Sequence, residues 1–292
     1  MEAFDSELQS IYLALICVAC VLLVHYKTQV LHLDADSIPL PRVRFSDLII
    51  PLGIYIVLST TLYAFAYLLL NSIGWVDPDL PDDLVLESFH PYIEMVIMSI
   101  CLLCMLAYCK YSPEGYLDHF FWNITHERSW RFLGYNLFLG VKTYFSAFPF
   151  VFLMNALCVL FYAIFIGEVI EEQEAVSFFI KSIDNHSDLF FSILLIIFII
   201  PLLEEIIFRG FIHSSLRQYL GRFWGMITSS SIFALFHFST GQGWKNLEIV
   251  LSLFVLSLFI TWTFEKRRTL MAPLGLHMTF NAVSVVALSL TH

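Results

Sequence analysis

The residues from Leu189 to Arg209 read LFFSILLIIFIIPLLEEIIFR, a largely apolar run that ends in two glutamates and an arginine. About 20 apolar residues cross the hydrocarbon core of a bilayer as a helix, so this stretch is long enough to span. A charged side chain in the middle of such a helix costs about 3 kcal/mol on insertion scales. Glu204, Glu205 and Arg209 therefore need a physical reason for their position.

The composition of the whole chain excludes a soluble protein. Of its 292 residues, 59% are apolar and only 14% are charged, which is typical of proteins with several membrane spans. The sequence has no basic domain and no nucleic-acid motif, so the lipid bilayer is an expected partner and a nucleic acid is not. We predict an all-α, polytopic membrane helical bundle of about eight transmembrane helices, at residues 9–27, 48–70, 92–109, 143–166, 189–209, 222–240, 246–264 and 270–290.

The positions of the basic residues support this set of spans. When alternate loops are assigned to opposite sides, 13 of the 15 Lys and Arg residues fall on one side, and only Lys181 and Lys245 fall on the other. The second side also carries acidic clusters at 77–87 and 168–174. Because Lys and Arg gather in cytoplasmic loops, we expect an integral, multi-pass protein of the cell or plasma membrane with both termini on the non-cytoplasmic side.

Polar residues divide the chain into two regions. Residues 1–170 hold four spans filled with Leu, Ile, Val, Phe and Cys and have no role that we can assign. Residues 189–290 hold four spans with ionisable and amide side chains, so any chemistry is expected there. The aromatic and charged segment 112–141 between the third and fourth spans is typical of a segment lying in the membrane interface. The alternative is that Phe132 to Val141 extend the fourth helix.

The two adjacent glutamates are expected to play different parts. Glu205 and Arg209 are four residues apart on one face of a helix, where opposite charges neutralise each other in lipid. Glu204 points about 100° away from Glu205 and has no local partner. We therefore interpret Glu205 with Arg209 as a structural pair and Glu204 as the free carboxylate.

A helical hairpin would bring His237 to Glu204. Glu204 lies 17 residues before Gly221, and His237 lies 16 residues after it. If the chain turns at Gly221, both side chains are roughly 25 Å from the turn and share a depth on neighbouring antiparallel helices. Arg217 and Arg222 at the tip would then project into the cytoplasm.

The last span adds His277 and Asn281, which are four residues apart and face the same direction. A desolvated Glu204 acting with His237 could take a proton from a water molecule that attacks a carbonyl. His277 and Asn281 could donate hydrogen bonds to the developing oxyanion, each worth about 3 kcal/mol. Phe233 is interpreted as packing that shields His237. A zinc ion held by Glu204, His237 and His277 is a chemically competent alternative to this metal-free mechanism.

Other mechanisms lack their sequence signatures. The chain contains no H-E-x-x-H zinc-protease pattern and no G-x-S-x-G elbow, and Gly241-Gln242-Gly243 is followed by Trp244 rather than by an aspartate. Serine, aspartyl and zincin intramembrane hydrolases are therefore disfavoured. A proton-coupled transporter could also use intramembrane Glu and His, but it is weakened by the absence of matched broken helices in two halves.

Three motifs in order resemble those of the CAAX protease and bacteriocin-processing (Abi) family, which includes type II CAAX prenyl endopeptidases. They are EExxxR at Glu204–Arg209, FxxxH at Phe233–His237 and HxxxN at His277–Asn281, and the resemblance covers roughly residues 189–290. It implies that Glu204 and His237 activate the water and that His277 and Asn281 form the oxyanion site. Glu205 and Arg209 would support them. Family members have been described both as metalloproteases and as glutamate-dependent proteases, so zinc stays an alternative and no cofactor is required in the mechanism we favour.

The resemblance also indicates the class of substrate. It implies an endopeptidase that cleaves a membrane-associated protein or peptide, CAAX-like and with or without a lipid modification. The alternative function is that of a non-catalytic bacteriocin-immunity or scaffold protein of the same family, which would act by binding another membrane protein.

Overall fold

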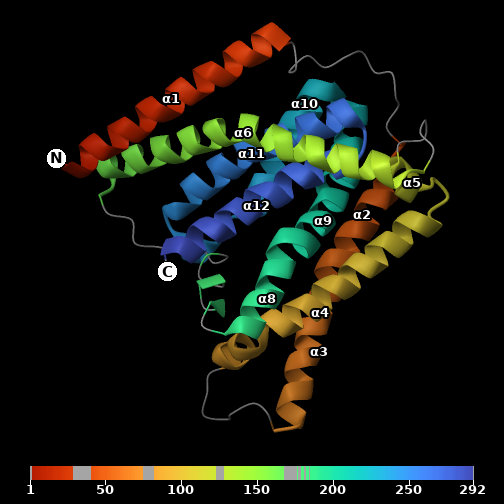
Figure 1. Ribbon diagram of the computed structural model, residues 1–292. Helices are drawn as coiled ribbons and strands as arrows, with labels where there is room; N and C mark the ends of the chain where they lie inside the picture. The colour runs from red at the N-terminus through yellow and green to blue at the C-terminus, as the bar shows by residue number, and fades with distance from the viewer. Residues whose placement is uncertain are drawn as a thin grey trace.

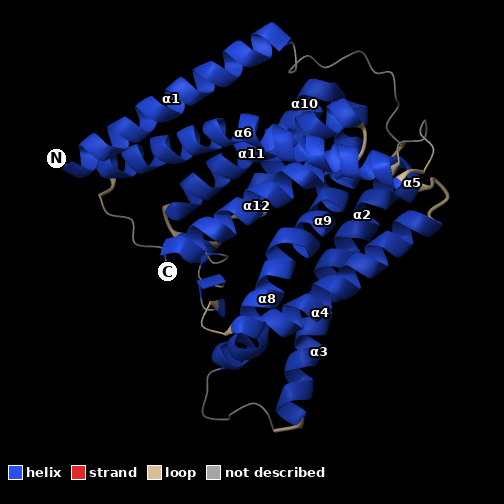
Figure 2. Ribbon diagram, in the orientation of Figure 1, coloured by secondary structure: helices blue, strands red, loops and turns tan. Residues whose placement is uncertain are grey.

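In the computed structural model, all elements in the described part of the chain are helical (Figure 2). The described residues are 2–28, 41–74, 82–122, 128–167, 176, 179–180, 182–183 and 185–291. The predicted all-α fold of a polytopic membrane protein is confirmed. The helices are α1 (Glu2–Thr28), α2 (Phe45–Gly53), η1 (Ile54–Leu58), α3 (Ser59–Ser72), α4 (Asp82–Tyr111), α5 (Tyr116–Phe121), α6 (Trp130–Phe165), α8 (His186–Leu194), η2 (Leu195–Ile199), α9 (Ile200–Glu205), η3 (Ile206–His213), α10 (Ser214–Leu235), η4 (Thr240–Gln242), α11 (Lys245–Arg267) and α12 (Met271–Thr291).

Within the described residues, seven helical runs are long and apolar enough to cross a membrane. They are Leu8–Tyr26, Ser46–Ser72, Pro91–Tyr111, Trp130–Phe165, His186–Leu235, Lys245–Arg267 and Met271–Leu290. The fifth run contains both the fifth and the sixth predicted spans. The sixth of these, 222–240, is helical as far as Leu235 and then enters a turn. The predicted number of eight transmembrane helices is therefore reached only when the two limbs of the fifth run are counted as separate helices.

The fifth run folds back on itself at Gly221, as the hairpin argument predicted. Gly221 has φ 74° and ψ 177°, a backbone conformation that is essentially restricted to glycine. Contacts across the two limbs are symmetric about this residue. His213 Nδ1 lies 3.2 Å from Ser229 Oγ, and a Cβ atom placed on Gly225 would come within 2.9 Å of the Arg217 Cα.

The arginines at the tip of the hairpin bind a carboxylate of α11 and are largely covered, rather than projecting freely, and their place on the cytoplasmic side stays a prediction. Arg217 Nε lies 2.7 Å from Glu265 Oε1, and Arg222 Nε lies 3.2 Å from Glu265 Oε2. Arg268 and His213 contact the same carboxylate at 2.9 Å and 2.7 Å. Glu265 is fully buried, and a buried carboxylate is tolerated only with compensating charges and hydrogen bonds. The sequence of the hairpin does not indicate that Glu265 is the partner of its arginines.

The segment 112–141, predicted to lie in the membrane interface, is helical in two of its described parts, and its place in the interface stays a prediction. Helix α5 covers Tyr116–Phe121, and α6 begins at Trp130, so residues 132–141 extend the fourth helix, as the alternative proposed. The 36 residues of α6 measure about 54 Å at a rise of 1.5 Å per residue. That is longer than the roughly 30 Å of bilayer hydrocarbon. Residues 123–127 lie outside the described residues, as do 77–81 and 168–174 of the predicted acidic clusters.

The helices form two groups that meet near the middle of the chain's fifth run (Figure 1). In one group, α6 packs against α11 and α12, and α1 lies along α6. In the other, α4 packs against α3, η1, α8 and α9. Helices α6 and α12 touch backbone to backbone, because a Cβ on Gly140 would come within 2.0 Å of the Ala272 carbonyl oxygen and a Cβ on Gly275 within 2.1 Å of that of Leu137. The division into regions 1–170 and 189–290 stays a prediction, but α6 of the first region packs directly against α12 of the second.

Candidate active site

Glu204 and Glu205 end helix α9, which lies between two π-helical segments, η2 and η3. Pro201 stands in the first turn of α9, where it cannot donate the backbone hydrogen bond that would continue a regular ladder. Short π-helical segments inside α-helices occur frequently at functional sites. On the far side of the glutamates, the Ser214 hydroxyl donates a hydrogen bond to the Arg209 carbonyl oxygen at 3.0 Å. The two carboxylates therefore project from an irregular part of the hairpin's first limb.

Glu205 and Arg209 form the predicted ion pair deep inside the protein. Arg209 Nη1 lies 3.0 Å from Glu205 Oε1, and the two side chains are 1% and 0% exposed. The same carboxylate oxygen accepts a hydrogen bond of 2.8 Å from His277 Nδ1, and Arg209 Nη2 donates to Ser257 Oγ at 2.8 Å. The ring centroid of Phe233 lies 4.5 Å from the guanidinium. The pair thus joins the hairpin to α11 and α12.

Glu204 faces the two histidines that the sequence selected. Its Oε1 atom lies 3.7 Å from His237 Nε2, and its Oε2 atom lies 3.6 Å from His277 Nε2. Both distances are longer than the roughly 2.7–3.2 Å of a direct hydrogen bond. A single water molecule beside the carboxylate can bridge gaps of this size. Glu204 also remains 15% exposed, whereas Glu205 is sealed from solvent.

The hydrogen bonds on the far side of each imidazole determine which ring nitrogen carries a proton. His237 Nδ1 lies 2.9 Å from the carbonyl oxygen of Phe233, and a carbonyl oxygen can only accept. His277 Nδ1 lies 2.8 Å from the carboxylate of Glu205, which also accepts. Both Nδ1 atoms therefore carry hydrogen, and in the neutral imidazoles both Nε2 atoms present a lone pair toward Glu204. Phe233 shields His237 as predicted, with ring centroids 4.8 Å apart, and it also supplies this carbonyl.

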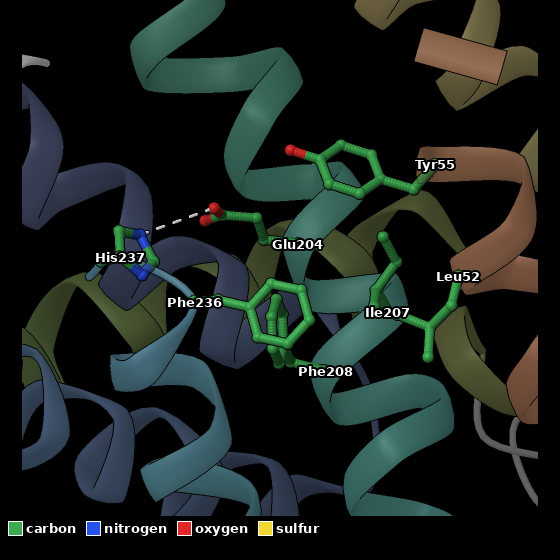
Figure 3. A pocket seen from close by; sticks show the side chains of 7 residues that line it. All are labelled: Leu52, Tyr55, Glu204, Ile207, Phe208, Phe236 and His237. Carbon is green, nitrogen blue, oxygen red and sulfur yellow. Dashed lines mark ion pairs between the residues drawn. The ribbon is translucent and has the colours of Figure 1, made fainter. Parts of the chain in front are cut away.

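A pocket of about 200 Å³ opens beside Glu204 and His237 (Figure 3). Two of the lining residues come from the N-terminal region, from α2 and η1. Neither had any signal in the sequence, because both lie inside an apolar span. In Figure 3 the hydroxyl of Tyr55 is at the end of the ring nearer the Glu204 carboxylate. The seven lining residues are Leu52, Tyr55, Glu204, Ile207, Phe208, Phe236 and His237.

Asn281 lies on the same helix as His277 but makes a different contact. Its Nδ2 atom donates a hydrogen bond of 2.7 Å to the carbonyl oxygen of Ile196 in η2. Neither Asn281 nor His277 is among the seven residues that line the pocket. The structure therefore brings His277 to Glu204, while the oxyanion role of Asn281 stays a prediction.

The three candidate zinc ligands are Glu204, His237 and His277. A zinc ion requires its nitrogen and oxygen ligands at roughly 2.0–2.2 Å. The two oxygens of Glu204 face different histidines, and in the described part of the chain no three His, Cys, Asp or Glu side chains are grouped closely enough to hold a metal ion. No step below therefore uses a metal, and a zinc ion held by Glu204, His237 and His277 stays an alternative prediction.

Comparisons with known proteins identify the region that carries this site. Residues 186–283 match the family model described as type II CAAX prenyl endopeptidase Rce1-like. The chain is also 34% identical over 92 residues to UPF0177 protein YxdF of Lactococcus lactis subsp. lactis (strain IL1403). The aligned residues make up 32% of this chain and 47% of that protein. The chain thus spans about half the length of the curated relative that it matches. No solved structure gives a significant match. Residues 186–283, which carry this site, are thus similar to the Rce1-like family of type II CAAX prenyl endopeptidases, and they belong to a chain whose described residues include seven helical runs long and apolar enough to cross a membrane.

Proposed function

We propose that this protein is an intramembrane endopeptidase that hydrolyses a peptide bond in a membrane-associated, CAAX-like protein or peptide. The observation that carries the proposal is the arrangement around Glu204. Its carboxylate is partly exposed in a pocket and faces the Nε2 atoms of His237 and His277 at 3.7 Å and 3.6 Å. Next to it, the neutralised pair of Glu205 and Arg209 leaves Glu204 as the negative charge of the site.

In this mechanism Glu204 and His237 activate a water molecule. The water donates one hydrogen bond to the Glu204 carboxylate and the other to the lone pair of His237 Nε2. As the water oxygen bonds to the carbonyl carbon of the substrate, its proton passes to Glu204, and the carbonyl oxygen becomes an oxyanion. The protonated Glu204 then delivers that proton to the leaving amine nitrogen as the C–N bond breaks.

His277 serves this cycle through its second nitrogen. Glu205 accepts the Nδ1 hydrogen and thereby orients the ring, as carboxylates do for catalytic histidines. A second proton, taken up by His277 Nε2 from solvent before the substrate binds, makes this nitrogen a donor to the oxyanion, and the Glu205 carboxylate stabilises the imidazolium. Asn281 uses Nδ2 to bind Ile196, and the amide group has a second hydrogen with which it would assist.

The proposal is tested by removing the base without changing the fold. Membranes of cells that express the wild type or Glu204→Gln are compared for peptides with shifted termini, and His237→Ala and His277→Ala are run in parallel. We expect the wild-type cleavage products to disappear in all three variants while expression and thermal unfolding stay unchanged.

The matched control is Glu248→Gln in α11. Glu248 is a carboxylate in the apolar run Lys245–Arg267, 11% exposed and paired with Lys245 at 2.7 Å, and it is not among the seven residues that line the pocket. This variant should retain cleavage. Full activity in Glu204→Gln would contradict the mechanism. If variants at Glu204, His237, His277 and Asn281 all kept the cellular phenotype, the binding or immunity alternative would be favoured instead.

Metal dependence is a separate measurement. The purified protein is analysed for bound zinc, and cleavage is assayed before and after treatment with a chelator. The mechanism above predicts that activity survives chelation. Loss of activity that added zinc restores would instead favour the metal alternative.

A further inference from the structure

The wall of the pocket facing Glu204 belongs to the N-terminal region, which the family match at residues 186–283 does not include. Tyr55 is the second residue of the π-helical segment η1, which follows α2 directly. Leu52 and Tyr55 line the pocket together with Glu204 and His237. In Figure 3 the Tyr55 hydroxyl is directed toward the side of the pocket where the Glu204 carboxylate lies.

The seven lining residues supply few hydrogen-bond donors. Four of them are apolar, namely Leu52, Ile207, Phe208 and Phe236. An ionised Glu204 can only accept hydrogen bonds. His237 gives its Nδ1 hydrogen to the Phe233 carbonyl and presents a lone pair at Nε2 in its neutral form. Among these seven residues, the phenolic O–H of Tyr55 is thus the donor that faces the pocket.

The reaction requires such a donor. When water attacks a carbonyl, negative charge develops on the oxygen, and a fixed donor about 3 Å away stabilises it in the transition state. Each of the two donors expected from the sequence uses one N–H elsewhere, and neither residue is among the seven that line the pocket. Asn281 Nδ2 donates to Ile196 at 2.7 Å, and His277 Nδ1 donates to Glu205 at 2.8 Å.

We propose that Tyr55 is a catalytic residue supplied by the N-terminal region, whose O–H donates a hydrogen bond to the substrate carbonyl and to the oxyanion that forms from it. No proton is transferred, so the O–H bond of Tyr55 stays intact throughout. The carbonyl lies between Tyr55 on one wall and the water held by Glu204 and His237 on the other. This role rests on the proposed function, and it makes the segment η1 of the N-terminal region part of the active site.

The test is Tyr55→Phe in the purified full chain, because phenylalanine keeps the ring and removes only the hydroxyl. The probe is a farnesylated peptide that ends in a Cys-a-a-X sequence, presented in detergent micelles. If the wild type leaves this peptide intact, the cleavage-site sequence found by membrane proteomics replaces it. We expect kcat to fall about 100-fold, as for loss of one oxyanion donor, with KM and the thermal unfolding midpoint unchanged. The control is Tyr111→Phe, whose tyrosine is 77% exposed and should be dispensable.

A second readout reports on the transition state. A peptide aldehyde forms a tetrahedral hydrate that resembles the intermediate, so its inhibition constant should rise in Tyr55→Phe by about the factor by which kcat/KM falls. A residue that only supports packing would not produce this match.

The outcomes separate the two proposals. If Glu204→Gln is inactive while Tyr55→Phe keeps both kcat and aldehyde affinity, the Tyr55 assignment is wrong and the proposed function stands. A raised KM with an unchanged kcat also overturns the assignment, because it indicates a role in binding or packing. If Glu204→Gln is fully active, or the wild type cleaves neither probe, the proposed function fails and the role of Tyr55 fails with it.

Discussion

Replacing Glu205 by glutamine tests whether this residue stabilises the fold around the site, in contrast to Glu204, which is proposed to react. Glutamine has the same shape as glutamate, and its carbonyl can still accept hydrogen bonds from Arg209 and His277. The negative charge is lost, however, and the Arg209 guanidinium, only 1% exposed, is left without a compensating charge. Removing one partner of a buried ion pair costs about 3–5 kcal/mol. We therefore expect Glu205→Gln to unfold at a much lower temperature than the wild type.

The double variant Glu205→Gln with Arg209→Met tests whether the lost stability comes from the uncompensated charge of Arg209. It removes both charges and replaces the guanidinium with an apolar group, a change that is often neutral for stability. We expect most of the lost stability to return. Cleavage should stay impaired, because the neutral amide at position 205 cannot stabilise a positive charge on His277.

The assay combines thermal unfolding in detergent micelles with cleavage of the farnesylated peptide. Glu248→Gln is the control, because its partner Lys245 is 29% exposed, and partly exposed pairs contribute about 0–1 kcal/mol. An unchanged unfolding midpoint for Glu205→Gln would refute the reasoning. So would a double variant that is no more stable than the single one.

Three further predictions concern the frame around the site. Gly275→Ala should destabilise the protein by about 1–3 kcal/mol, because the new Cβ would meet a backbone oxygen at 2.1 Å, whereas Gly134→Ala has nothing within 4 Å and should be neutral in thermal unfolding. Glu265→Gln should lower the unfolding midpoint and increase proteolysis at the hairpin tip, because three arginines lose their buried counter-charge. Gly221→Ala should cost about 1–3 kcal/mol for its backbone conformation, while Gly53→Ala in a helix, also with open space, should be neutral or slightly stabilising. A Gly221→Ala variant as stable as the wild type would contradict the turn described above.

Features that depend on spacing along one helix or one hairpin were predictable from the sequence. The ion pair of Glu205 and Arg209 follows from an i,i+4 separation, and the meeting of Glu204 with His237 follows from nearly equal residue counts, 17 and 16, on either side of Gly221. The apolar runs predicted the helices because the bilayer sets their length. These inferences need only the rise and the turn angle of an α-helix.

Contacts between helices that are distant in the chain were not predictable in the same way. Three contacts depend on which helices lie side by side. They are the hydrogen bond from His277 to Glu205, the binding of the tip arginines by Glu265, and the position of Tyr55 opposite Glu204. Hydropathy does not encode this, because every apolar face is acceptable to lipid. Asn281 illustrates the limit, since its spacing from His277 predicts a shared face but not that it would reach Ile196 in η2.

The turn at Gly221 sets a dimension that should be visible when relatives are compared. Thirty-three positions separate Glu204 from His237, and each added residue would rotate a side chain by about 100° and shift it by about 1.5 Å. An insertion in one limb alone would pull the carboxylate and the imidazole apart. Only equal additions of about two helical turns, roughly seven residues per limb, restore both depth and direction. In relatives, the number of residues between the motif that contains Glu204 and the motif that contains His237 should therefore stay constant or change in steps of about 14.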